Sequence, residues 1–113
     1  MITIYHNPRC SKSRACNVML EDLGKEVKVI NYTKELFTEI TLKEVIDLLK
    51  IKPIELVRTN EQEWKDLYKG KDLSDAEVIK AMVKHYKLIQ RPIVVNGNKA
   101  AIGRPLDAVK DIL

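Results

Sequence analysis

The chain has 113 residues, a length that supports one domain with a buried core. Hydrophobic residues make up 45% and charged residues 32%, which is ordinary for a soluble globular protein. The net charge of +4 is small, the basic residues are scattered, and one Phe and one Trp offer little to stack on bases, so nucleic-acid binding is not expected.

Several other classes of protein are also disfavoured by composition. No apolar run approaches 18 residues, and the N-terminus lacks a basic region followed by an apolar core, so neither a membrane span nor a secretory signal is expected. Two cysteines do not make a disulfide scaffold, and with two distant histidines they match no metal-ligand spacing. We therefore expect a cytoplasmic, single-domain protein spanning 1–113, without a bound metal.

The first third of the chain has the pattern of a βαβ unit. Residues 1–5 form a short apolar run that predicts a strand. A helical stripe follows, and Gly24 is a stop signal after it. Alternation over 26–32 predicts a second strand, parallel to the first. The stripe is spaced at i, i+3, i+4 and i+7 and consists of Cys16, Met19, Leu20 and Leu23.

The middle of the chain, about residues 41–87, is predicted to be an all-helical insert. Thr41 with Glu44, and Ser74 with Glu77, each have the spacing of a capping box, which predicts two helix starts.

Two shorter helices are predicted between these two. Pro53 suits the first position of one over 54–57, and 61–68 forms the other. His85 falls on the last helix of the insert, where we expect it to be solvated. The side chains expected on one side of the second short helix are Trp64, Leu67 and Tyr68.

The end of the chain predicts a hairpin and a helix. Strands are expected over 93–95 and 99–102, joined by a turn at 96–98 that needs a positive φ. Pro105 is expected to open a final helix running to Leu113. The whole order, βαβ, helices, then ββα, predicts an α/β protein with a four-stranded mixed sheet, the thioredoxin-like arrangement with a helical insert.

Cys10 lies on the predicted turn between the first strand and the first helix. Free N–H groups at a helix start favour negative charge, so a cysteine there is stabilised as the nucleophilic thiolate. Arg9, Lys12 and Arg14 act in the same direction, as does His6 when protonated. The alternative is that Cys10 is a small buried hydrophobe within a solvated basic loop.

Four short motifs carry a resemblance to a known family. The segment His6-Asn7-Pro8-x-Cys10-x-x-Ser13-Arg14 resembles the opening signature of the glutaredoxin-coupled arsenate reductase family. The later motifs that fit, in the same order, are Leu56-Val57-Arg58-Thr59, Arg91-Pro92-Ile93-Val94 and Ile102-Gly103-Arg104-Pro105.

The resemblance implies a thioredoxin-like fold and an arsenate-reducing activity. Cys10 would attack arsenate and form a covalent adduct, His6 would sit behind the thiolate in the oxyanion site, and Pro92 would be a cis-proline. Glutathione would be the co-substrate and glutaredoxin a transient partner of a monomeric enzyme with no tightly bound cofactor. The residues that would bind the oxyanion are Arg58, Arg91 and Arg104.

The residues themselves leave alternatives open. Each arginine follows or precedes a predicted element, where a guanidinium fork can bind a tetrahedral oxyanion, yet each could also be a surface charge. His6 could equally be a structural histidine at a strand end. Cys16 shares the apolar stripe of the first helix, so we expect it to be buried and inert.

Two further functions compete with arsenate reduction. Arg9, Lys12 and Ser13 stand where the best-known members have a small residue and a Gly-Thr pair, which leaves the substrate open. One alternative is a glutathione-dependent thiol reductase without arsenate activity. The other is a Spx-type redox regulator that binds RNA polymerase, but that branch uses a Cys-x-x-Cys pair and this chain has Ser13 at the second position.

Overall fold

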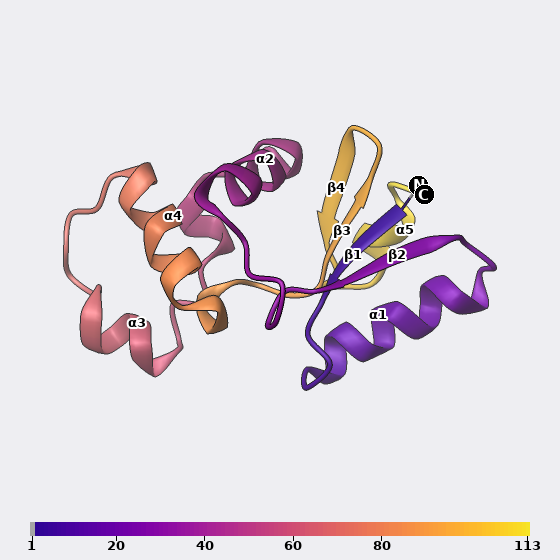
Figure 1. Ribbon diagram of the computed structural model, residues 1–113, viewed down its shortest axis with the longest axis horizontal. Helices are drawn as coiled ribbons and strands as arrows, with labels where there is room; N and C mark the ends of the chain where they lie inside the picture. The colour runs from indigo at the N-terminus through magenta and orange to yellow at the C-terminus, as the bar shows by residue number, and fades with distance from the viewer. Residues whose placement is uncertain (1) are drawn as a thin grey trace. The chain divides into compact units, whose positions relative to one another are not determined.

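The computed structural model describes residues 2–113, all of the chain except Met1. Figure 1 shows the elements in chain order. They are β1 (Ile2–His6), α1 (Ser11–Asp22), β2 (Val27–Asn31), α2 (Glu39–Leu49), the 3₁₀ helix η1 (Pro53–Leu56), α3 (Gln62–Leu67), α4 (Asp75–Lys84), the 3₁₀ helix η2 (Tyr86–Leu88), β3 (Ile93–Asn96), β4 (Lys99–Ile102) and α5 (Asp107–Lys110).

The elements gather into two compact units. One consists of the chain up to Glu35 together with Arg91–Leu113, and the other of Leu36–Gln90. The first unit holds a four-stranded sheet in the order β2-β1-β3-β4. Strand β1 is parallel to β2 and antiparallel to β3, and β3 is antiparallel to β4. The predicted mixed sheet, built from a βαβ unit and a hairpin, is therefore confirmed.

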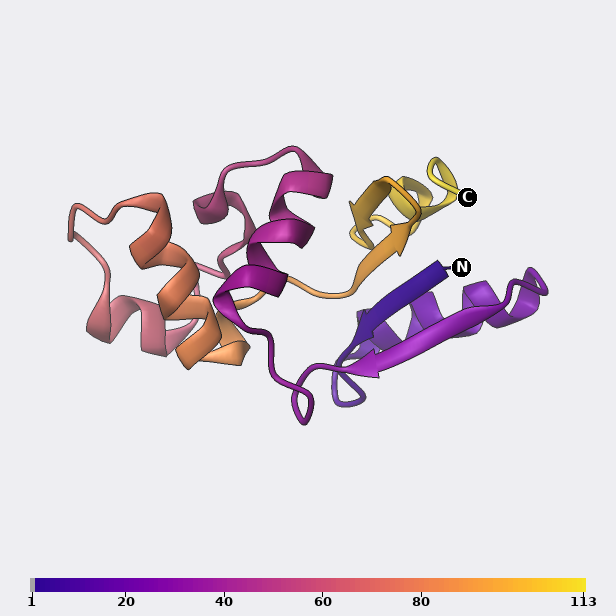
Figure 2. The same cartoon turned by 45° about the horizontal axis from the view of Figure 1, so that its top comes forward.

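The core of the first unit lies between one face of the sheet and two helices. Ile4, Val94 and Ala101 are in register across β1, β3 and β4 and belong to one buried cluster. Leu20 from α1 and Val109 from α5, both with no exposed surface, join the same cluster. Helices α1 and α5 therefore cover the same face of the sheet (Figure 2). This packing fixes the start of α1 relative to the ends of the strands.

The segments before β3 and after β4 meet through a close backbone contact. The Gly103 N–H donates to the Pro92 carbonyl at 2.8 Å. A Cβ at Gly103 would lie 2.7 Å from Pro92 Cγ, closer than side chains tolerate, so only glycine fits without a shift. The Arg91–Pro92 peptide bond is cis, as the family resemblance implies. Gly97 has a φ of 61°, which confirms the positive φ expected in the hairpin turn.

One predicted helix start in the second unit is correct and the other is wrong. Ser74 caps α4 and exchanges hydrogen bonds with Glu77, as predicted. Helix α2 begins at Glu39, with Thr38 rather than Thr41 as N-cap. The Thr41 N–H donates to Thr38 Oγ1 at 3.1 Å, and the Thr38 N–H donates to Thr41 Oγ1 at 2.9 Å. A threonine at the third helical position thus replaces the glutamate of the usual capping box.

The last helix is shorter than predicted. Helix α5 has four residues, with Leu106 as its N-cap, and Pro105 lies outside it. The Arg104–Pro105 bond is cis. Val109 is fully buried and faces the core as predicted.

The prediction that His85 is solvated is wrong. It follows the last residue of α4, its side chain is only 19% exposed, and its Nδ1 lies 2.6 Å from Glu63 Oε2 of α3. Its ring also meets Tyr68 edge-on, and Tyr68 stacks on the buried Trp64. Leu67, expected beside them, is 44% exposed, because α3 ends there and its apolar side is only one turn long.

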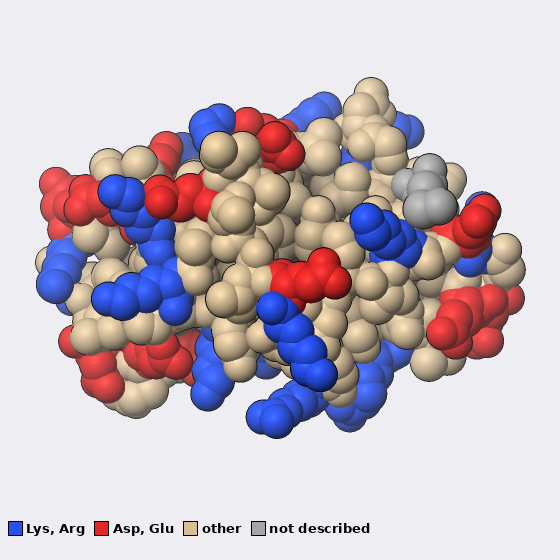
Figure 3. Space-filling model, in the orientation of Figure 1, with Lys and Arg blue, Asp and Glu red and all other residues tan. Residues whose placement is uncertain are grey.

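Within residues 2–113, no helix is long and apolar enough to cross a membrane. The same residues contain no group of three or more His, Cys, Asp or Glu side chains that could hold a metal ion. Basic and acidic side chains are interspersed on the face shown in Figure 3.

Candidate active site

Cys10 is the residue at which β1 and its loop give way to α1. It is the N-cap of the helix, with extended backbone angles of φ −95° and ψ 122°. Its N–H donates to the Asn7 carbonyl at 3.0 Å, and Asn7 Oδ1 accepts the Arg9 N–H at 3.0 Å. Cys10 is 7% exposed, so its sulfur is held in a defined position at the helix start.

The surroundings of Cys10 favour its thiolate form. Burial of the thiol raises its pKa, but hydrogen bonding from Arg91, the backbone N–H groups of Ser13 and Lys12, and the charge of Arg91 all lower it. The net effect brings the pKa of Cys10 from an ordinary value of 9.0 to about 7. A thiol with this pKa is therefore partly ionised to the nucleophilic thiolate near neutral pH.

Two of the three predicted anion-binding arginines lie at this sulfur. Arg104 Nη2 is 3.5 Å from Cys10 Sγ, and Arg104 Nε donates to the Arg91 carbonyl at 2.8 Å. Arg91 contributes hydrogen bonding and charge to the thiol, while its Nε is buried and has no hydrogen-bond partner among the described residues. A donor buried in this way costs free energy unless something accepts its hydrogen, so it is suited to an anion.

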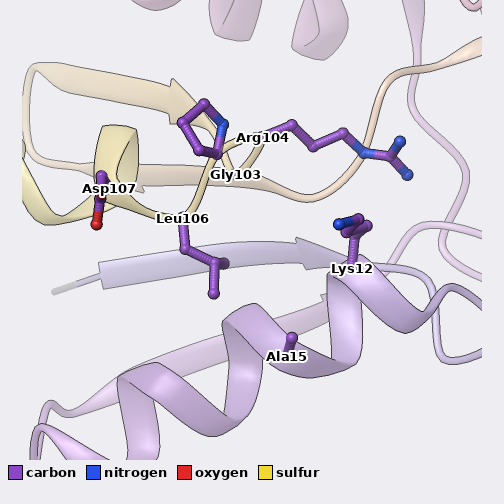
Figure 4. Close-up of a pocket in the computed structure, with 7 residues that line it drawn as sticks. Lys12, Ala15, Gly103, Arg104, Leu106 and Asp107 are labelled. Atoms are coloured by element: carbon purple, nitrogen blue, oxygen red, sulfur yellow. The ribbon is translucent and has the colours of Figure 1, made fainter.

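A pocket of about 480 Å³ opens between α1 and the segment after β4, within the first unit. Lys12 and Ala15 of α1 line one side, and the loop from β4 to α5 lines the other (Figure 4). Arg104 belongs both to this lining and to the contacts of Cys10. No sequence pattern predicts this pocket, because it depends on how α1 packs against the later segment. The lining residues after β4 are Gly103, Arg104, Pro105, Leu106 and, at the start of α5, Asp107.

His6 is held by a residue that sequence reasoning did not assign to the site. Its Nδ1 lies 2.5 Å from Ser13 Oγ, and Ser13 is fully buried. Burial of the ring, and then the charge of Arg14, lower the pKa of His6, so the imidazole is neutral at pH 7. A neutral imidazole adds no positive charge, so His6 does not stabilise the thiolate by its charge at neutral pH. The role of His6 in the oxyanion site stays a prediction.

Arg58 belongs to the second unit. Its N–H donates to the Leu88 carbonyl at 2.7 Å, next to an isolated β-bridge between Val57 and Ile89. Its Nη1 pairs with Glu61 Oε1 at 2.5 Å and donates to the Lys87 carbonyl at 3.2 Å. The guanidinium is thus anchored in its own unit, and its role as an anion ligand stays a prediction.

Cys16 is buried, as its place on the apolar stripe predicts. It has no exposed surface and belongs to the core cluster under the sheet. Burial raises its pKa to about 11, so it is a neutral thiol at physiological pH. A neutral, inaccessible thiol is a poor nucleophile and a poor resolving cysteine.

Cys10 is expected to alkylate with a pH midpoint near 7. Because the thiolate is the reacting form, the rate constant for iodoacetamide follows the ionised fraction and levels off about one to two pH units above the midpoint. The measurement is a pH series with the modified cysteine located by mass spectrometry. A midpoint at or above the free-thiol value of about 8.5 would contradict the assignment of Cys10 as an activated nucleophile.

Cys16→Ala is expected to retain most of the activity and to lose roughly 1 kcal/mol or more of unfolding free energy. The loss comes from removing a buried sulfur from a packed core and leaving a small cavity. Turnover and denaturant unfolding of the variant provide the two measurements. Loss of turnover, together with a Cys10–Cys16 disulfide in the wild-type protein, would instead show an intramolecular relay.

Comparison with known proteins places these residues in a family context. The arsenate reductase of Haemophilus influenzae is 40% identical over 99% of this chain and 98% of its own length. The uncharacterised protein YfgD of Escherichia coli is 42% identical over 99% of this chain and 96% of its own. The solved arsenate reductase from Vibrio cholerae superposes with a TM-score of 0.94 at 39% identity, covering 99% of this chain and 97% of that one.

The sequence comparison and the structure comparison both match proteins named arsenate reductases. The structural match covers nearly the whole chain and includes the thioredoxin-like sheet with its helical insert. The sequence model of the ArsC family matches residues 5–112, a stretch that begins just before His6 and includes Cys10 and all three arginines. The chain therefore belongs to the ArsC family.

Proposed function

We propose that this protein reduces arsenate to arsenite through a covalent adduct on Cys10. The observation that carries the proposal is the pairing of a buried thiol, whose pKa is about 7, with the guanidinium groups of Arg91 and Arg104. Relatives named arsenate reductases at 40% and 37% identity over 99% of the chain support the choice of substrate. Arsenate is a tetrahedral oxyanion, and guanidinium groups match its geometry and charge.

In the first step, the Cys10 thiolate attacks arsenic and an oxygen leaves as water after protonation. The arsenic remains pentavalent in this adduct. Thiolate and arsenate repel each other, so the guanidinium groups of Arg91 and Arg104, joined by Arg58, hold the oxygens and stabilise their charge in the transition state. The buried Nε of Arg91, which lacks a protein partner among the described residues, is one donor suited to this role.

Reduction of the adduct needs two electrons, which two thiols supply as they become one disulfide. The internal candidate, Cys16, is fully buried and has a pKa of about 11, so the electrons are expected to come from outside the chain. We propose glutathione as the co-substrate and glutaredoxin as the protein that completes the reduction. The pocket of about 480 Å³ lined by Arg104, the arginine that contacts Cys10 Sγ, provides room for a small thiol.

The proposal includes the setting in which the enzyme works. We propose a monomeric, single-domain enzyme in the cytoplasm, where the glutathione pool keeps thiols reduced. No tightly bound cofactor takes part, because the thiol substrates carry the electrons.

The test is a turnover assay with two substrates run side by side. One arm follows arsenite formation from arsenate with glutathione and glutaredoxin, and the other follows reduction of a glutathione mixed disulfide. We expect arsenate-dependent turnover that needs Cys10. Turnover with the disulfide alone would make the protein a glutathione-dependent thiol reductase. Inactivity in both arms, with capture of RNA polymerase, would favour a Spx-type regulator.

A further inference from the structure

The hydroxyl of Ser13 joins three parts of the active-site loop. Ser13 is the third residue of α1 and has no exposed surface. Its Oγ lies 2.5 Å from Nδ1 of His6, the last residue of β1, and accepts the Asn7 N–H at 3.0 Å. One small side chain therefore ties the end of the strand, the loop and the first turn of the helix together.

The first turn of α1 lacks the usual capping contacts at its N-terminus. Cys10 makes no side-chain capping hydrogen bond, and the turn contains no acidic residue to interact with the free N–H groups. Helix ends without such partners tend to fray. Side-chain bonds to the preceding loop hold the turn instead: Arg14 Nη1 donates to the Pro8 carbonyl at 2.8 Å, and Ser13 Oγ bonds His6 and Asn7. In either tautomer of the neutral ring, one proton lies between His6 Nδ1 and Ser13 Oγ.

The backbone of the same residue acts on the nucleophile. The N–H groups of Ser13 and Lys12 are among the groups that lower the pKa of Cys10. These donors stabilise the thiolate only while they point at the sulfur, and their direction follows the orientation of the first turn.

We propose that Ser13 is a positioning residue, whose buried hydroxyl clamps the first turn of α1 to His6 and Asn7 and so aims two backbone N–H groups at the Cys10 thiolate. This inference rests on the proposed function only in taking Cys10 as the reacting group. The charged groups beside the sulfur, Arg91 and Arg104, come from other segments of the chain. Within residues 2–113, the hydrogen bonds of the Ser13 hydroxyl go to His6 and Asn7.

The test compares Ser13→Ala with Ser11→Ala as the matched control. Ser11 lies in the same helical turn and is exposed, whereas the hydroxyl that bonds His6 is that of Ser13. Alanine is the best helix former, so neither variant is expected to lose α1. In Ser13→Ala the alkylation midpoint of Cys10 should rise by about one pH unit, which lowers the iodoacetamide rate at pH 6 about tenfold. Ser11→Ala should keep the wild-type midpoint.

A third variant separates the hydroxyl from mere packing. Ser13→Thr retains the hydroxyl, so its midpoint should stay near that of the wild type, whereas a purely structural role would change the melting temperature and leave all midpoints equal. An unchanged midpoint in Ser13→Ala, or an equal rise in Ser13→Thr, would overturn the proposal. Iodoacetamide needs no arsenate, so an inactive arsenate assay with a shifted midpoint would count against the proposed function alone.

Discussion

Replacing Cys10 by serine is expected to abolish arsenate-dependent turnover, with a loss on the order of 10³-fold or more in kcat. The thiolate, with a pKa of about 7, is the nucleophile available at neutral pH in the described site. A serine hydroxyl in the same place stays protonated, since none of the surrounding groups is a base strong enough to ionise it. Arsenite formation measured with glutathione and glutaredoxin in excess gives the result.

The matched control is Cys16→Ala, which removes the other thiol of the chain. Cys16 lies in the core, so this variant should turn over arsenate at nearly the wild-type rate. Mass spectrometry after incubation with arsenate should detect an arsenic adduct on Cys10 in the wild type and in Cys16→Ala, and none in Cys10→Ser. Turnover by Cys10→Ser above a tenth of the wild-type rate would contradict the assignment of Cys10 as the nucleophile.

Arginine-to-lysine substitutions are expected to lower kcat/KM for arsenate on the order of tenfold or more at each of Arg58, Arg91 and Arg104. Lysine keeps the positive charge but loses the planar fork that binds two oxygens at once. Negative charge stays on the arsenate oxygens as one oxygen leaves, so fixed donors contribute most in the transition state. Steady-state kinetics with arsenate as the varied substrate measures the effect.

Alkylation of Cys10 by neutral iodoacetamide separates anion binding from a general effect on the thiol. At a pH where the thiol is fully ionised, the three lysine variants should alkylate at nearly the wild-type rate. Arg9→Lys serves as the matched control, because Arg9 is an exposed arginine of the same loop with no predicted part in anion binding. If all three variants reduce arsenate with wild-type kinetics, the three arginines do not bind arsenate and are surface charges.

Arg104→Lys needs one additional check. The Arg104 Nε donates to the Arg91 carbonyl, and lysine cannot reproduce that hydrogen bond together with the contact to Cys10 Sγ. Arg91→Lys leaves the same carbonyl in place. A thermal melt of both variants therefore distinguishes a loss of loop order from a loss of anion contacts.

The strands and the main helices could be predicted because their signals are local. The apolar stripe through Cys16 and Leu20 predicted α1, and both residues are fully buried against the sheet. The Ser74–Glu77 capping box and the positive φ at Gly97 were also confirmed. Each of these features depends on residues within a few positions of one another, so periodicity and capping chemistry are sufficient.

The errors fall where two local solutions compete or where packing decides. Thr41 with Glu44 has the spacing of a capping box, but Thr38 and Thr41 bond each other one turn earlier and start α2 there. His85 was expected in solvent, and instead it pairs with Glu63 of another helix. No spacing rule predicts that pairing, since it depends on how α3 returns against the end of α4.

The sequence by itself determined the order of elements, the thioredoxin-like class and the candidate nucleophile, since strand alternation, helical stripes and a cysteine at a helix start are all properties of neighbouring residues. Only the tertiary structure decided that Arg91 and Arg104 meet Cys10, that Ser13 is buried against His6, and that a pocket lined by Arg104 opens between α1 and the segment after β4. The contact between Arg104 and Cys10 spans 94 positions in the chain. Such contacts arise because the sheet brings the start of α1 and the segments flanking β3 and β4 together, and packing across the sheet leaves no periodic trace in the sequence.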